Sequence, residues 1–340
     1  MKKTNKSTKK IKKIAILASG GNSPGMNNVV ITLVKKAISL GITPYLIYDG
    51  YKGLLAKDFR QVDNEMLRWI ENYNSRGNIF IGSARSTDFY KPEVKKIGVK
   101  ILKEKKIDVL FCIGGDGTYK GAAGLAHFGA KVMGLPGTID NDISSSEQTI
   151  GFFTCLNRIV NVLDALRDSF DSHSGICFCE VMGRGFSDLA IYAGVAADAE
   201  AIVTKDNIKT KEQFLEIANK VKANGKRSCL FVVTESLYGK DGLPSLQEIA
   251  KWMEEKTGRT TRVNVIGHVQ RGGITDAWDR ANASLMACHA LDCAVKGNTN
   301  RVISVVKGQI VDIDIAKATN MPRKKNKMDI LKEYKDLALM

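Results

Sequence analysis

Short apolar runs alternate with longer segments of helical periodicity along almost the whole chain. Residues 13–19, 108–113 and 229–234 are nearly continuous apolar runs, which are typical of strands buried on both faces of a parallel sheet. The longest helical stripe consists of Leu156, Ile159, Leu163, Leu166 and Phe170. This alternation predicts an α/β protein with mostly parallel sheets.

The remaining predicted elements are shorter or less regular. Further strands are expected at residues 45–48, 131–135, 176–182, 262–266 and 302–306, with one that ends at Val203 and one that ends within residues 80–85. Helices are expected at residues 64–73, 188–197, 211–223, 244–257, 277–295 and 330–339, with one that follows residue 27 and ends near Leu40 and one that begins at Pro92.

Polar side chains recur just after the predicted strands. In open α/β sheets, ligands bind at the carboxyl ends of the strands. Glycine, arginine and histidine together with carboxylates are the residues that phosphoryl transfer needs, because its catalysis is mainly positioning and charge neutralisation. The residues in these positions are Gly21, Arg85, Asp116, Asp140, Arg184, Glu235, His268 and Arg271.

The segment after the strand at residues 131–135 carries two carboxylates, Asp140 and Asp142. In an extended segment, side chains two residues apart point the same way. Two carboxylates facing one space repel unless they divide the work or a cation lies between them. We interpret one as a general base and the other as a ligand of Mg²⁺ through water, because this ion keeps several of its waters when bound. The alternative is an Asx turn that caps a helix.

Two glycine-rich loops follow strands and precede helices, at residues 20–27 and 114–118. A helix N-terminus after a glycine loop presents backbone N–H groups to phosphate. A tight strand-to-helix turn also requires glycine, so the first loop alone leaves both interpretations open. Asp116 is the only charged residue of the second loop, and it fits either a phosphate or metal site or a helix cap.

The chain length of 340 residues is sufficient for two domains. Hydrophobic residues make up 44% and charged residues 26%, and no apolar run of about 18 residues predicts a membrane span. Residues 1–13 lack the apolar core of a signal peptide. The seven cysteines form no paired motif and are interpreted as reduced core thiols, which favours a cytoplasmic location.

The formal net charge is +15, and much of it lies near the chain ends. Seven lysines fall within the first 13 residues, and residues 323–327 form a second basic stretch. We interpret residues 1–12 as a disordered tail and both stretches as solvated. Nucleic-acid binding or attraction of anionic substrates are the alternatives, and the lack of aromatic residues among the N-terminal lysines disfavours nucleic acid.

Five motifs in series resemble the ATP-dependent 6-phosphofructokinases of the bacterial type. The resemblance extends from about residue 13 to beyond residue 300. It implies two Rossmann-like, three-layer domains, with ATP bound by residues 13–151 and 270–320. Residues 152–269 and 321–340 would bind the sugar phosphate and an effector. The motifs are residues 20–27, 114–117, 136–142, 182–184 and 267–273.

The resemblance also implies a reaction and the residues that perform it. The reaction is magnesium-dependent phosphorylation of fructose 6-phosphate at its 1-hydroxyl by ATP, in an allosteric homotetramer with sites shared between subunits. Asp140 would be the base, assisted by Thr138 and Arg184, with Asp116 and Asp142 as metal ligands. The ATP site would contain Gly21, Tyr51, Arg85, Ser86, Asp116, Gly117 and Thr118. The sugar-phosphate site would contain Thr138, Asp140, Met182, Gly183, Arg184, Glu235, His268 and Arg271, with Arg262 reaching a neighbouring subunit.

Gly117 and Gly137 bear on the phosphoryl donor, since pyrophosphate-using relatives tend to carry Asp and Lys there. The two glycines therefore favour ATP. Gly175 stands where the family usually has a second arginine for the sugar phosphate, and Asn22 replaces an aspartate of the first loop. The open alternatives are an enzyme for pyrophosphate or another sugar phosphate, and a non-catalytic or regulatory subunit.

The effector site that the resemblance implies is only partly retained. Ile31 and Asn64 replace common arginines, and Asn224 replaces a common lysine. This predicts weak or absent activation by ADP. The retained residues are Lys35, Arg167, Glu200 and Lys226.

Overall fold

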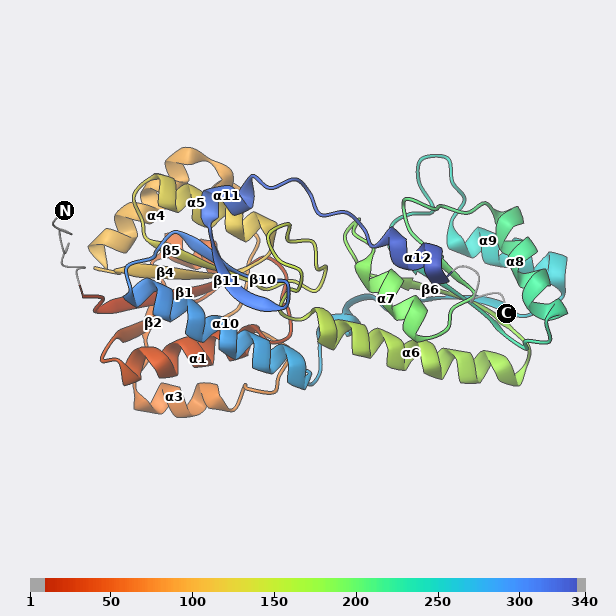
Figure 1. The fold of residues 1–340 in the computed structure, drawn as a ribbon, viewed down its shortest axis with the longest axis horizontal. Coiled ribbons are helices and arrows are strands. Elements are labelled where there is room, and N and C mark those ends of the chain that lie inside the picture. Colours follow the sequence, from red (N-terminus) through yellow and green to blue (C-terminus); the bar gives the residue numbers. More distant parts are fainter. Residues whose placement is uncertain (1–9, 335–340) are drawn as a thin grey trace. The chain divides into compact units, whose positions relative to one another are not determined.

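The computed structural model describes residues 10–334, so most of the predicted N-terminal tail lies outside the described residues. The chain divides into two compact units. The first comprises residues 1–153 and 271–324, and the second comprises residues 154–270 and 325–340. Both have the α/β architecture with mostly parallel sheets that the sequence predicts (Figure 1).

The first unit contains a seven-stranded sheet in the order β11-β10-β5-β4-β1-β2-β3. Only the outermost pairs, β10–β11 and β2–β3, are antiparallel. The strands are β1 (Lys13–Ser19), β2 (Thr43–Ile47), β3 (Phe59–Gln61), β4 (Val109–Gly114), β5 (Val132–Pro136), β10 (Arg301–Val306) and β11 (Gln309–Asp314).

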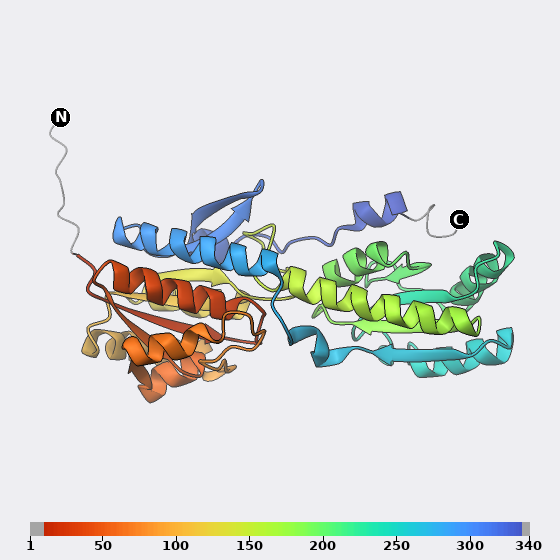
Figure 2. The ribbon, with the colours of Figure 1, turned by 90° about the horizontal axis from the view of Figure 1, so that it is seen from below.

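Helices cover both faces of this sheet. Alternate residues of β1 separate the two cores, with Ile14 and Ile16 on one face and Ala15 and Leu17 on the other. Figure 2 shows α1 and α10 side by side on the first face. The first face carries α1 (Met26–Ser39), α3 (Asn64–Glu71) and α10 (Ala277–Val295), and the second carries α2 (Gly50–Ala56), α4 (Pro92–Glu104), α5 (Asp116–His127) and α11 (Ile315–Thr319).

The second unit contains a four-stranded, fully parallel sheet in the order β7-β8-β6-β9. Phe178, Phe214 and Phe231 form the aromatic centre of one face, where α8 and α9 pack. Gly194 of α7 packs on Ile202 at the opposite face. The elements are α6 (Phe152–Ser172), β6 (Ile176–Val181), α7 (Asp188–Ala196), β7 (Ala201–Val203), α8 (Lys211–Ala223), β8 (Cys229–Thr234), α9 (Leu246–Thr257), β9 (Thr261–Val265) and α12 (Met328–Tyr334).

The prediction of a strand that ends within residues 80–85 is wrong. This segment is irregular and touches the sheet only through an isolated bridge between Ser19 and Ala84. β2 pairs with β1 only as far as Ile16, and the segment meets β1 beyond that point at a single residue, Ser19. The physical reason is a local turn, in which Gly82 N donates to Ile79 O and Gly82 adopts a φ of +67°, away from an extended path.

Within residues 10–334, no helix combines the length and apolar character needed to cross a membrane. All seven cysteines are free thiols, and six of them are buried, as expected of core residues. The predicted helix at residues 330–339 corresponds to α12, which ends at Tyr334 in the part that the structure describes.

Candidate functional site

Three neighbouring strands of the first unit end at the same edge of the sheet, and a loop follows each of them. Ser19 at the end of β1 lies opposite Gly114 at the end of β4, and Gly114 lies opposite Pro136 at the end of β5. The loops also touch, since Gly137 N donates a hydrogen bond to Gly114 O at 3.2 Å. The fold therefore brings together the polar loops that follow β1, β4 and β5.

Arg271 lies against the first glycine loop. Its Nη1 atom donates to Asn22 O at 3.1 Å, and the Asn22 amide donates to Arg271 O at the same distance. A Cβ atom at Gly21 would lie 3.1 Å from Arg271 Nη1, so the glycine leaves room for the guanidinium. The resemblance assigns Arg271 to the sugar phosphate, and the structure places it within the first unit beside the loop assigned to ATP.

Asp116 is the first residue of α5, where the positive end of the helix dipole favours carboxylate or phosphate. Its carboxylate forms an ion pair with Lys120, whose Nζ atom lies 2.7 Å from Asp116 Oδ2, and both side chains are 54% exposed. Exposed pairs are worth at most about 1 kcal/mol, so this contact exchanges readily for a ligand. Lys120 was absent from the predicted site, although its spacing four residues after Asp116 is a visible signal.

The side chains of Tyr51 and Thr118 make their contacts within the protein. The Tyr51 hydroxyl donates to Thr118 O at 2.6 Å, and its ring stacks on Phe89 with centroids 4.0 Å apart. Thr118 Oγ1 donates to Ser19 O at 2.9 Å. Burial raises the pKa of Tyr51 well above its usual value. These side chains fix the loops against each other, and their contact with ATP stays a prediction.

The segment with Arg85 and Ser86 lies beside the end of β1. Ser19 Oγ donates to Ala84 O at 3.2 Å, and Ser83 Oγ donates to Gly20 O at 3.1 Å. Arg85 is exposed and Ser86 is half-buried. The structure thus places both predicted ATP ligands next to the first glycine loop.

The loop after β5 bends between its two carboxylates. Thr138 and Asp140 are 8% and 5% exposed, and Asp142 is half-buried. Asp140 N donates to Thr138 Oγ1 at 3.2 Å. Asn141 has a φ of +51°, in the left-handed region. The prediction of an extended backbone from Asp140 to Asp142 is therefore wrong, because the chain turns at Asn141.

The alternative interpretation of this loop was a helix cap. The next helix, α6, begins only at Phe152, so neither Asp140 nor Asp142 stands at a helix start. Asp140 is therefore a buried carboxylate that caps no helix, and its Oδ2 atom accepts a hydrogen bond from Thr138 Oγ1 at 3.5 Å.

Gly117 and Gly137, the two glycines used to predict the phosphoryl donor, differ in their surroundings. A Cβ atom at Gly117 would meet only the hydroxyl of Tyr90, at 3.1 Å, and the Tyr90 side chain is exposed. A Cβ atom at Gly137 would lie 2.8 Å from Met26 Cε and 3.0 Å from Ile113 Cγ2, both in the core. Any larger residue at position 137 therefore displaces buried side chains.

In the second unit, Glu235 orders the turn after β6. Its Oε1 atom accepts hydrogen bonds from Gly183 N at 3.1 Å and Arg184 N at 2.7 Å. Arg184 is exposed, with a φ of +49°. Burial and the charge of Glu235 raise the pKa of the neighbouring Glu180. The structure thus brings Gly183, Arg184 and Glu235 together.

Met182 and His268 lie near this turn, and Arg262 does not. Met182 N donates to Gln270 Oε1 at 3.1 Å, which joins the turn to the 3-10 helix Gly267–Arg271 that contains His268. Arg262 lies at the amino end of β9, paired with Glu254 at 2.6 Å. Gln270 is not among the predicted site residues, although it is a polar residue within the motif at residues 267–273, and its side chain is buried.

Gly175 is tightly surrounded by other residues of the second unit. A Cβ atom there would lie 2.5 Å from Phe170 Cδ1, 2.9 Å from His173 Nε2 and 3.1 Å from Thr260 O. Gly175 O accepts a hydrogen bond from Arg259 Nη2 at 3.2 Å. The backbone is packed for glycine, so the position offers no ready space for an arginine side chain.

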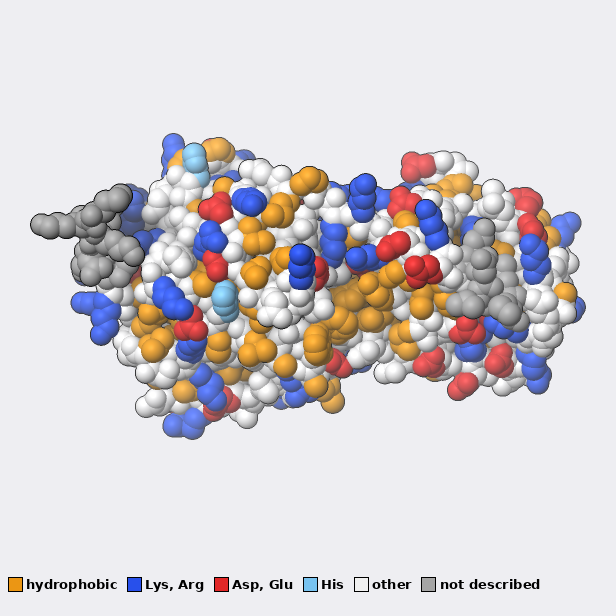
Figure 3. All heavy atoms as spheres, in the orientation of Figure 1, with side chains coloured by type: hydrophobic (Ala, Val, Ile, Leu, Met, Phe, Trp, Pro, Cys, Tyr) orange, Lys and Arg blue, Asp and Glu red, His pale blue; other side chains and the backbone are white. Residues whose placement is uncertain are grey.

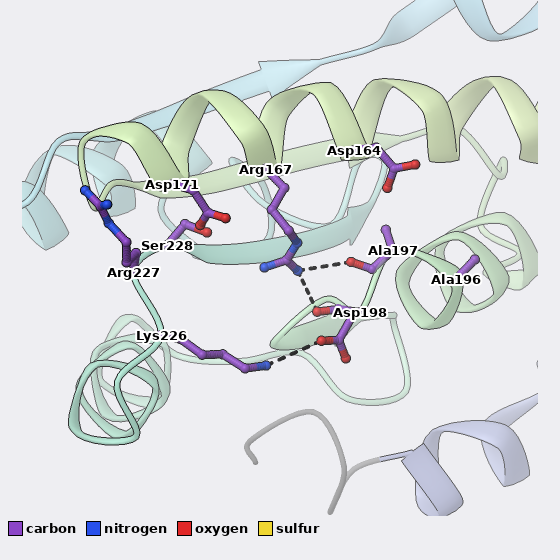
Figure 4. Close-up of a pocket in the computed structure, with 9 residues that line it drawn as sticks. All are labelled: Asp164, Arg167, Asp171, Ala196, Ala197, Asp198, Lys226, Arg227 and Ser228. Atoms are coloured by element: carbon purple, nitrogen blue, oxygen red, sulfur yellow. Dashed lines mark hydrogen bonds and ion pairs between the residues drawn. The ribbon is translucent and has the colours of Figure 1, made fainter.

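A second candidate site is a cavity of about 490 Å³ in the second unit (Figure 4). Arg167 and Lys226 face into it, together with Asp198. Glu200, fully buried beside the cavity, pairs with Arg167 at 3.1 Å and with Lys226 at 3.4 Å. Tyr334 of α12 donates to Asp198 Oδ1 at 2.8 Å. Arg167 and Lys226 are thus already partnered by carboxylates.

A third cluster contains His289, Cys293 and Asp312, whose ligand atoms lie within 4.8 Å of one another. Asp312 already accepts hydrogen bonds from Arg301, at 2.6 Å from Nε. Burial and the Asp312 charge raise the pKa of Cys293 to about 11, which keeps the thiol protonated. We interpret this cluster as a hydrogen-bonded ion pair, and it includes neither Asp116 nor Asp142.

The basic stretch at residues 323–327 was interpreted as solvated, and this is wrong for Lys324. The Lys324 ammonium donates to the carbonyls of Asn141 at 2.9 Å, Glu147 at 3.2 Å and Ser146 at 3.3 Å. On the face drawn in Figure 3, other Lys and Arg side chains are scattered among neutral and acidic ones. They form no continuous basic stripe there of the kind that nucleic-acid binding uses.

Comparison with known proteins identifies relatives over nearly the full length. The family model described as Phosphofructokinase matches residues 13–294. A protein from Mycoplasma mobile named ATP-dependent 6-phosphofructokinase is 43% identical over 321 residues, which cover 93% of this chain and 96% of the relative.

Solved structures give the same result for the fold. The phosphofructokinase of Saccharomyces cerevisiae matches with a TM-score of 0.80 and 29% identity, and the match covers 96% of this chain and 47% of the yeast chain. The chain thus spans about half the length of that protein. A pyrophosphate-dependent phosphofructokinase from Marinobacter aquaeolei matches with a TM-score of 0.81 at 18% identity over 97% of this chain and 92% of that one, a likeness of fold alone.

Proposed function

Because the chain belongs to the phosphofructokinase family, we propose that it phosphorylates fructose 6-phosphate at the 1-hydroxyl with ATP. The products are fructose 1,6-bisphosphate and ADP, and the reaction is a step of glycolysis. The observation that carries this proposal is the meeting of the loops after β1, β4 and β5 at one sheet edge. Buried Asp140 lies in the loop after β5, and Asp116 begins the helix that follows β4.

In this proposal Asp140 accepts the proton of the sugar 1-hydroxyl, because a positioned carboxylate can act as general base. Thr138 and Arg184 bind the phosphoryl group during transfer. The first unit binds ATP through the loops of Gly21, Arg85 and Gly117, with Tyr51, Ser86 and Thr118 completing the ATP site. The sugar phosphate is bound through Met182, Gly183, Glu235 and His268, and Arg271 is a further proposed ligand of it.

Asp116 and Asp142 are the proposed ligands of Mg²⁺. Carboxylate oxygens suit this hard cation, and the exposed carboxylate of Asp116 can exchange Lys120 for the ion. When bound, the ion would neutralise phosphate charge as ATP reacts.

We further propose a cytoplasmic homotetramer with shared sites. The support is the placement of Arg262 at the amino end of β9, at the opposite end of that strand from the turn that leads to His268. A role for Arg262 in a neighbouring subunit explains why a residue assigned to the sugar phosphate lies apart from the others.

The first test is steady-state phosphorylation of fructose 6-phosphate with ATP and, separately, with pyrophosphate. We expect turnover with ATP and at least about a hundredfold lower kcat/KM with pyrophosphate, a difference of about 2.7 kcal/mol. The physical reason is that Gly117 and Gly137 leave the donor site without the bulk and charge of pyrophosphate-using relatives. Equal turnover with both donors would contradict the donor assignment.

No turnover with either donor, in the presence of magnesium and with the protein folded, would contradict the proposed function. Another phosphorylated sugar or a non-catalytic subunit would then become the leading interpretation. A scan of other sugar phosphates with ATP separates these two, because only the first gives turnover.

We expect ADP to change the half-saturating concentration of fructose 6-phosphate by less than about twofold. The proposed effector cations, Arg167 and Lys226, are already paired with Glu200, so a nucleotide phosphate would have to break those contacts. Each hydrogen bond to a charged group is worth roughly 1.5–3 kcal/mol. The measurement is the sugar saturation curve at saturating ATP, with and without ADP.

A Glu200→Gln variant is the matched comparison for the ADP experiment. It removes the carboxylate charge that competes for Arg167 and Lys226 while keeping the side-chain size. A clear ADP-induced drop in the half-saturating sugar concentration of the unmodified protein would contradict the prediction.

A further inference from the structure

The loop that carries Asp140 and Asp142 is anchored at both ends. Thr149 Oγ1 donates to Thr138 O at 2.7 Å, and Ile150 N donates to Pro136 O at 2.8 Å. These contacts close the loop where it leaves β5 and where it approaches α6. They do not fix the direction of the turn at Asn141 in between.

Lys324 binds the middle of that loop. Its ammonium has three N–H donors, and three loop carbonyls, those of Asn141, Ser146 and Glu147, accept them at 2.9–3.3 Å. The Lys324 backbone N also donates to Ser144 Oγ at 3.2 Å. A single residue therefore joins both sides of the segment 141–147.

The shortest of these contacts reaches the residue between the two carboxylates. Asn141 adopts a left-handed conformation, which is uncommon for a residue other than glycine. Rotation of that peptide would swing Asp140 and Asp142 relative to each other. A cation bonded to Asn141 O opposes such a rotation.

We propose that Lys324 is a positioning residue that holds the turn between Asp140 and Asp142 in its reactive geometry. This inference rests on the proposed function for its effect on turnover. It assigns a specific role to Lys324, whose neighbours in the basic stretch, Arg323 and Lys325, are exposed.

The test compares Lys324→Met with Lys325→Met in the full chain. Methionine keeps the apolar stem and removes the ammonium. We expect Lys324→Met to lower kcat by about ten- to hundredfold, since small misplacements of reacting groups have effects of that size. We expect less than about a threefold change in the half-saturating concentration of fructose 6-phosphate and a raised Mg²⁺ requirement. Lys324→Arg should recover part of the lost kcat, and Lys325→Met should behave as the unmodified protein.

Hydrogen exchange of the amides in residues 139–148 provides a readout that does not depend on turnover. Lys324→Met should accelerate exchange there, with unchanged protection of β4 and β10 as the control for folding. Unchanged exchange in residues 139–148, or an unchanged kcat in an active enzyme, would overturn the proposal. If Lys324→Met does not fold, the same measurements on Lys324→Gln decide it.

Absence of turnover in the unmodified protein would remove the proposed function without deciding this inference. In that case the exchange experiment alone tells whether Lys324 orders the loop. The two proposals therefore fail through different observations.

Discussion

Replacing Asp140 with serine is expected to lower kcat by about a hundred- to ten-thousandfold, the range that a general base contributes. Asp140 is 5% exposed, and its backbone N is fixed by Thr138 Oγ1. Removal of the carboxylate therefore leaves the loop closed but without a proton acceptor. Steady-state turnover, with fructose 6-phosphate binding measured separately by calorimetry, tests this expectation.

Asp140→Asn is the matched variant because it keeps the shape of the side chain and removes only its basicity. We expect the same loss of kcat, with sugar-phosphate affinity within a few-fold of the unmodified protein. Turnover within tenfold of normal in either variant would mean that another group accepts the proton.

Replacing Gly175 with arginine is expected to destabilise the second unit by at least about 1–3 kcal/mol, the usual cost of overpacking. The family resemblance alone predicts a gain in sugar-phosphate affinity from this change. The structure opposes that prediction, because the new Cβ atom would lie 2.5 Å from Phe170 Cδ1 and 3.1 Å from Thr260 O. The measurements are the denaturant midpoint and the half-saturating concentration of fructose 6-phosphate.

Gly175→Ala is the control, since it introduces the same Cβ atom without charge or length. We expect alanine to account for much of the destabilisation. Gly175→Arg combined with Phe170→Ala removes the nearest obstacle, the buried ring of Phe170. A stable single variant with tighter fructose 6-phosphate binding would show that the enclosure does not restrict an arginine.

The sequence predicts the sheets and long helices of this protein well because their patterns are local. Runs such as residues 229–234 correspond to whole strands, here β8. The strand predicted at residues 80–85 fails because a turn at Gly82, with a φ of +67°, interrupts the apolar segment. The hairpin β10–β11 was missed, although Lys307-Gly308 separates two apolar strands, because lysine at φ +51° is an unusual turn residue.

In the candidate site, too, features with a local sequence signal are predicted and features that depend on distant residues are not. Glycine loops and carboxylates after strands identify which segments meet, because parallel strands end at one edge. The turn at Asn141 and the contact of Lys324 with the loop cannot be read locally. Lys324 is 183 residues from Asn141 in the sequence, and its charge resembles that of its exposed neighbours.

The order of the chain has a consequence for biosynthesis. The first unit begins at the N-terminus but needs residues 271–324, which supply α10 beside α1 and β10 beside β5. The ribosome therefore synthesises most of the second unit before the first unit can bury its whole core. Until then the apolar surfaces of α1 and β5 that α10 and β10 cover are exposed in the nascent chain, a state prone to aggregation and suited to chaperone binding.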